Sequence, residues 1–319
     1  MQRSISGVIA FILLVTTVPA MATEYVVNRL EPQITIDITN QLAAGRQMVD
    51  LELTPISGGT DFRYSAVFAP LTGGVSFVLR ATPTEWDAWL ADMDSRNGRF
   101  LDFEIEVIAG QVVRSGLFWE YTGEDYRYEI RSENTDADFQ TEQRDAWDAG
   151  LTIIDFEAFT EPGGGLRFGG LWVDGANQPR THLYYGLDWD EVQDLMDPLR
   201  GRVVDLERYT DDQGRTRFGI ILAMYPDGTS FADALMSAAT LSTTDAGRSD
   251  NLIDLDAHED EPGVLGFGGV WGDTWKGLRV VDPHPAVNTV PRGQEIDDVI
   301  AAFESGGQGR LGLFAMSTR

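Results

Sequence analysis

The chain has 319 residues, and its 51 acidic side chains outnumber its 24 lysines and arginines, so its formal net charge at pH 7 is −27. This charge argues against nucleic acids and anionic membranes as partners, because both are themselves negative. No cysteine occurs, so no disulfide stabilises the fold. Hydrophobic residues make up 43% of the chain, which is enough for a substantial core.

Residues 1–22 have the features of a signal peptide. Arg3 precedes an apolar run from Val8 to Val18, and small residues flank a candidate cleavage site before Thr23. The apolar run is short for a membrane span, and no later segment is longer. We therefore expect a secreted or periplasmic protein that is not inserted in a membrane after cleavage.

A pattern then recurs five times along the chain. Each copy begins with a strand-like segment that contains an aspartate, and the copies begin near residues 46, 99, 151, 202 and 250. The aspartates lie 49 to 53 residues apart. They are Asp50, Asp102, Asp155, Asp205 and Asp254. Repetition at this period is typical of stacked β units such as propeller blades.

Each copy predicts the same succession of elements. In "LTIIDFEAFTEPGGGLRFGGLW", two segments rich in β-branched and aromatic residues flank a glycine-rich turn, which predicts a hairpin. A third strand such as "THLYYGL" follows, and then a short helix such as "DWDEVQDLMD". The predicted unit is three strands and a helix.

The two ends of the chain predict a sixth unit that they share. Residues 309–319 resemble a first strand, while "EYVVNRL" and "QITIDIT" within residues 24–45 read as a second and a third strand. We therefore expect one domain over residues 23–319, an all-β closed propeller of about six three-stranded blades with short helices. Five blades with terminal extensions are the alternative.

A glutamate follows the aspartate by two residues in units one to four. If Glu207 lies opposite Arg217 in its hairpin, Asp205 lies opposite Gly219, and Glu52, Glu104 and Glu157 likewise face arginines. These glutamates are thus expected to form cross-strand ion pairs that support the register of the hairpin.

The recurring aspartates allow two interpretations. They can accept backbone N–H groups from a turn of the next blade, which is the interpretation we favour. Alternatively, they can line an axial channel and bind a hard cation such as Ca²⁺ through their oxygens. In unit five, Asp256 takes the place of the glutamate and His258 follows it in an acidic segment, so these two residues join the five aspartates as candidate binding residues. Their spacing fits no established metal motif.

Two segments resemble a known family. "GRVVDLERYTDDQGRTRFGIIL" and "THLYYGLDWDEVQDLMDPLRGR" are similar to the bacterial tandem repeats that precede the β-lactamase-like domain of the polyglycine hydrolases. The resemblance extends over the five units and implies a propeller-like fold. In that family the catalytic serine and lysine belong to the other domain, so the resemblance assigns no catalytic residue to this chain.

Together these features predict an exported, monomeric, non-catalytic module that needs no cofactor. Its expected ligand is an extracellular or envelope protein, a peptide or a glycan. One alternative is a hydrolase that uses carboxylates at the propeller channel, although an arginine opposite each glutamate would argue against it. Another alternative is a scaffold stabilised by Ca²⁺.

Overall fold

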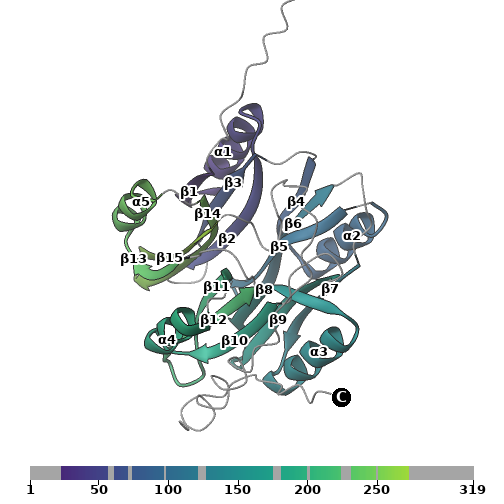
Figure 1. Ribbon diagram of the computed structural model, residues 1–319. Helices are drawn as coiled ribbons and strands as arrows, with labels where there is room; N and C mark the ends of the chain where they lie inside the picture. Colours follow the sequence, from purple (N-terminus) through teal and green to yellow (C-terminus); the bar gives the residue numbers. More distant parts are fainter. Residues whose placement is uncertain are drawn as a thin grey trace, which may run out of the picture.

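In a computed structural model of the chain, the described residues are 23–56, 61–70, 74–96, 98–120, 127–174, 181–199, 202–223, 231–248 and 251–272. The predicted signal peptide and residues 309–319 lie outside these ranges. Within them the chain forms five three-stranded antiparallel sheets, each with one helix. The helices lie at the periphery, and in each sheet the strand that directly follows the helix in the chain lies nearest the middle of the molecule (Figure 1).

The elements follow one another in the same order in every sheet. The first sheet contains β1 (Glu24–Arg29), α1 (Glu31–Ala43), β2 (Gln47–Ile56) and β3 (Asp61–Ala69). The second contains β4 (Gly74–Ala81), α2 (Pro83–Met93), β5 (Gly98–Ile108) and β6 (Gln111–Glu120). The third contains β7 (Tyr128–Asn134), α3 (Asp136–Asp148), β8 (Leu151–Thr160) and β9 (Leu166–Asp174).

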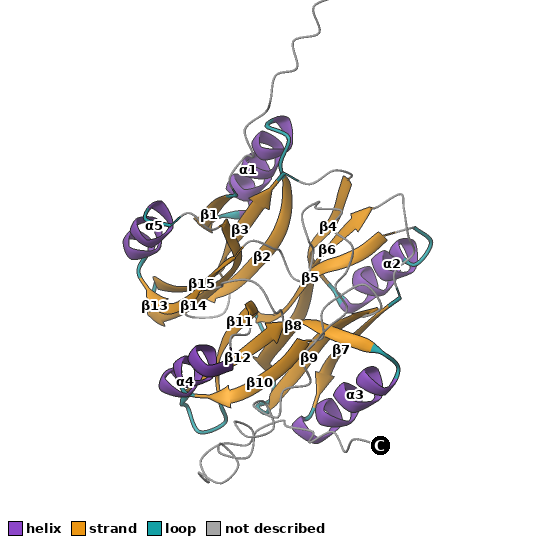
Figure 2. Cartoon of the chain, viewed as in Figure 1, coloured by secondary structure: helices purple, strands orange, loops and turns teal. Residues whose placement is uncertain are grey.

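The fourth sheet contains β10 (Thr181–Leu187), α4 (Trp189–Leu199), β11 (Arg202–Thr210) and β12 (Thr216–Ala223). The fifth contains β13 (Phe231–Met236), α5 (Ala238–Ala246), β14 (Asn251–Glu261) and β15 (Val264–Gly272). The five hairpins therefore begin where the sequence pattern placed them, and the separation of strands from helices is plain in Figure 2.

Each sheet begins one strand and one helix earlier in the chain than the sequence suggested. The strand that precedes each helix pairs with the second strand of the hairpin that follows, which gives the order β1-β3-β2 and its equivalents. The predicted "third strand" thus belongs to the next sheet. Periodicity determines the length of a repeat but not where one unit ends, so this boundary had to come from the strand pairing.

The N-terminal segment shows the clearest correction. Residues 24–29 form β1 and pair with β3, so they complete the first sheet instead of a sixth one. "QITIDIT" is part of α1 and is not a strand. Ile34, Ile36 and Ile38 alternate like a strand, but Ile34 and Ile38 are also one helical turn apart and are buried, while Ile36 is 60% exposed. The described residues therefore give five sheets and no shared blade.

The helices are held by their caps and by tryptophans of the sheets. The hydroxyls of Thr82, Thr135 and Ser237 accept hydrogen bonds from the backbone three residues later, as expected at helix N-termini. The indole N–H of Trp172 donates to Gln143 of α3 at 2.7 Å, and that of Trp271 donates to Asp245 of α5 at 3.0 Å. Each of these two helices is thereby fastened to the second hairpin strand of its sheet.

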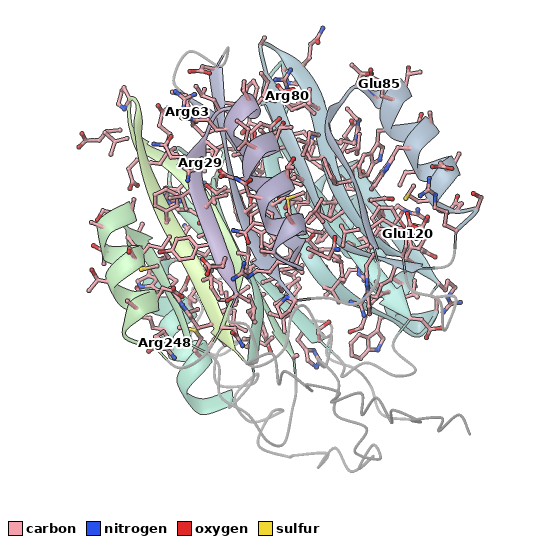
Figure 3. The ribbon with its side chains drawn as sticks, turned by 90° about the horizontal axis from the view of Figure 1, so that it is seen from above. Arg29, Arg63, Arg80, Glu85, Glu120 and Arg248 are labelled. Atoms are coloured by element: carbon pink, nitrogen blue, oxygen red, sulfur yellow. The ribbon has the colours of Figure 1, made fainter. Side chains whose placement is uncertain are left out.

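Ion pairs on the outside link neighbouring units. Arg80 of β4 pairs with Glu31 of α1 at 2.8 Å, and its guanidinium lies 4.1 Å from the centre of the Phe62 ring. Figure 3 shows Arg63 and Arg80 at the same edge of the molecule, and Glu85 at the start of α2. These exposed contacts each contribute little to stability, so the association of the sheets depends on what lies between them.

The first strands of the five hairpins contact one another in succession. β2 contacts β5, β5 contacts β8, β8 contacts β11 and β11 contacts β14; β14 in turn contacts β2. We call these five the inner strands. Each is an edge strand of its own sheet, so one row of its backbone N–H groups has no partner within that sheet.

Candidate functional site

The recurring aspartates lie on the inner strands and reach the backbone of the neighbouring sheet. Asp102 Oδ2 accepts from Leu51 N at 2.9 Å, and Asp155 Oδ2 accepts from Phe103 N at 2.8 Å. An equivalent hydrogen bond joins the first and fifth sheets, which are far apart in sequence: Asp50 Oδ2 accepts from Leu255 N at 3.0 Å. A buried carboxylate is tolerated when N–H donors compensate for its lost hydration.

The fourth and fifth sheets repeat the arrangement. Asp254 Oδ2 accepts from Leu206 N at 2.9 Å, and Asp205 is buried at the equivalent position. We call Asp50, Asp102, Asp155, Asp205 and Asp254 the first acidic layer. The favoured interpretation, backbone bonding between units, is confirmed for four of these residues, although the donors belong to the inner strands and not to turns. Their role in binding a ligand stays a prediction.

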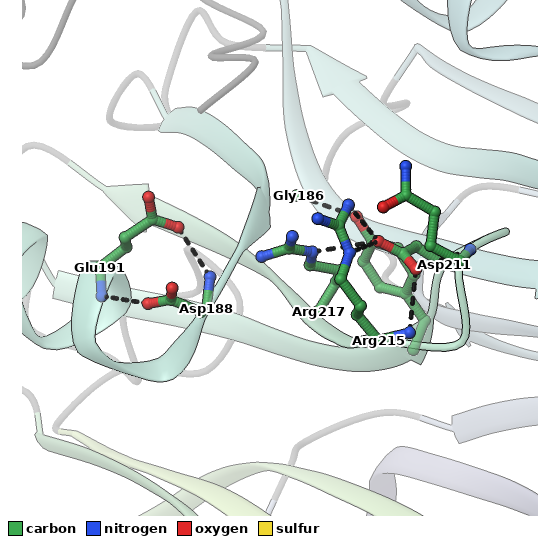
Figure 4. A network of polar contacts seen from close by, with 8 residues as sticks. Gly186, Asp188, Glu191, Asp211, Arg215 and Arg217 are labelled. Carbon is green, nitrogen blue, oxygen red and sulfur yellow. Dashed lines mark hydrogen bonds and ion pairs between the residues drawn. The ribbon is translucent and has the colours of Figure 1, made fainter. Parts of the chain in front are cut away.

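The predicted ion pairs between glutamates and arginines are wrong. Glu207 lies opposite Gly219, and Arg217 lies opposite Tyr209. The turn comprises residues 211–215, so the register is two residues away from the predicted one. Asp211 closes this turn, since its carboxylate binds both Arg215 and Arg217 (Figure 4).

The other hairpins are offset in the same direction, by two residues in the first and third sheets and by one residue in the second. Glu52 faces Ser65, Glu104 faces Ser115 and Glu157 faces Gly169. The arginines pair with different acids: Arg63 with Asp61, Arg114 with Glu133 and Arg167 with Glu161. Likewise, Asp205 lies opposite Ile221 and not Gly219, and Asp256 lies opposite Gly268 and not Gly266.

The glycines opposite Glu157, Glu207 and Asp256 have a packing role. A Cβ on Gly219 would lie 2.4 Å from the Phe156 ring of the third sheet, and a Cβ on Gly169 would lie 2.9 Å from Ile105 Cδ1 of the second. Gly268 receives Leu206 in the same way, at 3.1 Å. These glycines therefore make room for an apolar side chain from the preceding sheet.

Two residues beyond the first acidic layer lies a second one, which we define as Glu52, Glu104, Glu157, Glu207 and Asp256. Because side chains alternate along a strand, both layers lie on the same face of each inner strand. Glu157 Oε2 accepts from Ile105 N at 3.3 Å, the next outward-facing N–H after that of Phe103. Glu104, Glu157 and Asp256 are buried, while Glu52 and Glu207 are partly exposed.

Burial raises the pKa values of four members of the second acidic layer. The pKa values of Glu52, Glu157 and Glu207 are well above the usual value for glutamate, because desolvation and neighbouring carboxylates both disfavour ionisation. Desolvation raises the pKa of Asp256 to about 8, against the attraction of Arg208. Glu106, two residues further along β5, has a pKa raised to about 8 by burial. With pKa values of about 8, Glu106 and Asp256 retain most of their protons at neutral pH.

His258 lies at the end of this row. Its Nδ1 is 3.3 Å from Asp256 Oδ2, and its Nε2 is 3.3 Å from Asp260 Oδ1. Arg208 of the fourth sheet donates to the same Asp260 oxygen at 2.7 Å. Gly266 lies opposite His258, and a Cβ there would be only 2.4 Å from His258 Nε2. The structure therefore brings Asp256 and His258 together, and it adds Asp260 and Arg208, which the sequence had not singled out.

No group of three or more His, Cys, Asp or Glu side chains in the described ranges is arranged to hold a metal ion. The described helices include none that is long and apolar enough to cross a membrane. Sequence reasoning missed the second acidic layer as a set of mutually interacting groups, although the signal was present in the acid that follows each recurring aspartate by two residues.

Comparison with known protein families gives a match to part of the chain. Residues 118–175 match the model of the polyglycine hydrolase-like structural repeat, and no family of catalytic domains is detected. The matched segment runs from the end of β6 through β7, α3, β8 and β9, so it contains the whole third sheet. No curated protein matches the chain. Residues 118–175 are thus similar to a polyglycine hydrolase-like structural repeat, and the unit that matches is a strand, a helix and a hairpin.

Proposed function

We propose that the chain is an exported, non-catalytic binding module built as a closed propeller of five blades. The single observation that supports this is the hydrogen bonding between sheets by the first acidic layer. These bonds link the first sheet to the second, the second to the third and the fourth to the fifth, and the bond from Leu255 N to Asp50 links the fifth sheet back to the first. The first-layer aspartates, which recur in every unit, hold the scaffold together. The loops between strands are therefore the parts of the module that would select a ligand.

The proposed ligand is an extracellular or envelope protein, a peptide or a glycan. A chain with net charge −27 favours neutral or cationic ligands over anionic ones. The name of the matched family, a structural repeat, is consistent with a module that supports recognition and not chemistry.

The test is a binding screen with the whole exported chain. Labelled protein is applied to arrays of envelope glycans and of neutral, cationic and anionic peptides, and bound material is analysed for cleavage. We expect saturable binding without turnover of the ligand. If binding increases only with the positive charge of the peptides and salt abolishes it, the chain attracts cations through a non-specific acidic surface, which contradicts a specific binding module. Cellular fractionation of the native host tests export.

A second candidate is a hydrolase that uses the second acidic layer. The arginine objection no longer holds, and the raised pKa of Asp256, about 8, leaves a protonated acid near ionisable neighbours. Loss of ligand cleavage in Asp256→Asn, with binding intact, would support this candidate. Absence of cleavage in the wild-type screen would exclude it for the ligands used.

A further inference from the structure

The second acidic layer connects sheets and does not simply line them. Glu157 on β8 reaches the preceding sheet, where its carboxyl group accepts a hydrogen bond from Ile105 N. Asp256 likewise receives a backbone hydrogen bond from Arg208 of the fourth sheet. The layer is thus built into the contacts between inner strands, where a change in charge acts on the distance between sheets.

The members also act on one another across sheet boundaries. Glu52 is influenced by Glu104 of the second sheet, Asp256 of the fifth and Glu207 of the fourth. Carboxylates from three other sheets therefore act on one side chain. Their charges all have the same sign, so full ionisation would place several negative charges within one poorly hydrated region.

The charged and titratable groups that face the layer are nearly all acidic. Those that act on Glu52, Glu157, Glu207 and Asp256 are the other members of the layer, the first-layer residues Asp50, Asp102, Asp155, Asp205 and Asp254, and Glu106, Tyr209, Asp260, Arg208 and His258. Only Arg208 among these has a permanent positive charge. The arginines of the hairpins are engaged with other acids.

We propose that the second acidic layer is a proton-operated clamp, which holds the inner strands of the five sheets together when its carboxyl groups are protonated and loosens them when it ionises. A protonated carboxyl can donate its O–H to a neighbouring carboxylate, so retained protons convert repulsion into hydrogen bonds. Glu52 and Glu207 are partly exposed, which gives water access to the layer.

The sign of the pH effect follows from the raised pKa values. In the unfolded chain Glu106 ionises near its ordinary pKa of 4.5 and Asp256 near its ordinary pKa of 3.8, whereas burial holds both pKa values at about 8 in the folded protein. Stability contributed by such groups is fully present below the unfolded pKa and is lost as the pH rises through the folded one. The clamp is therefore closed in mild acid and released in mild alkali.

The experiment measures urea unfolding of the full chain from about pH 5 to about pH 9, where these groups titrate. We expect the urea midpoint of the wild type to fall steadily over this interval. Glu157→Gln and Glu207→Gln keep a neutral side chain of the same shape at every pH, so their midpoints should fall less. Asp87→Asn is the matched control, since it removes one negative charge from an exposed position on α2 and should retain the wild-type slope.

A second measurement does not depend on the variants folding. Amide hydrogen exchange of the wild type, corrected for the intrinsic pH dependence, should show earlier loss of protection at Leu51, Phe103 and Leu255 than at amides between β3 and β1 as the pH rises. A urea midpoint that does not fall from about pH 5 to about pH 9 overturns the clamp. So does an equal slope in wild type, Glu157→Gln and Asp87→Asn, which would assign the effect to overall charge.

Discussion

The two acidic layers lie two residues apart on the same strands, yet they differ in what their neighbours provide. In the first layer, the Asp155 carboxylate accepts a short hydrogen bond from Phe103 N, and this donor compensates for the hydration that the carboxylate loses on burial. In the second layer, Glu157 has a longer bond to Ile105 N, and its pKa is raised first by burial and then by the neighbouring carboxylates. Carboxyl groups on the same strands therefore serve as fixed hydrogen-bond acceptors in one layer and as titratable groups in the other.

Removing a first-layer carboxylate should have the largest effect. Asp155→Ala leaves Phe103 N buried without its acceptor, and we expect a loss of about 2–3 kcal/mol in the free energy of unfolding. Asp155→Asn retains an acceptor oxygen and should lose less. Urea denaturation at neutral pH measures both, with Asp87→Ala as an exposed control. Equal stability of Asp155→Ala and the control would remove the distinction between the layers.

The small residue opposite the second layer provides the next test. Gly219→Ala places a Cβ 2.4 Å from the Phe156 ring, so overpacking between the third and fourth sheets should cost about 1–3 kcal/mol. Gly74→Ala is the matched control, because a Cβ at that glycine meets nothing within 4 Å. If thermal unfolding shows the same stability for both variants, Gly219 is not a packing requirement.

Neutralising a second-layer residue should have a smaller effect, with the opposite sign. At about pH 8, Glu207→Gln removes a charge that burial and Asp256 disfavour, so its stability should be equal to that of the wild type or higher by about 1 kcal/mol. Near pH 5 the advantage should disappear. Chemical denaturation at the two pH values measures the difference, and destabilisation at the higher pH would show that Glu207 is needed in its ionised form.

The smallest expected effect is that of a chelator. One oxygen of each of four first-layer aspartates accepts a backbone N–H group and is thereby engaged in the scaffold, so we expect EDTA to leave the melting temperature unchanged. An increase in melting temperature on addition of Ca²⁺, reversed by EDTA, would instead support the calcium-stabilised scaffold and would place the second layer among its ligands.

The sequence anticipated a large part of this fold. The five hairpins and their starting points follow from repetition, because the same pattern of apolar residues and turns must produce the same local structure. The helix at α4 follows from apolar residues at helical spacing. "QITIDIT" could not be assigned in this way, because Ile34 and Ile38 suit one face of a helix and one face of a strand equally well.

Sequence alone determined that this protein is a disulfide-free array of repeated β units in which an acid recurs at one position of each unit. Tertiary structure decided which strands share a sheet, which residue each acid faces and which acids influence each other. Register depends on turn length, and a turn of residues 211–215 moves Arg217 away from Glu207. The charge state of a carboxyl depends on the donors and carboxylates that other sheets place around it, and those neighbours come from distant parts of the chain.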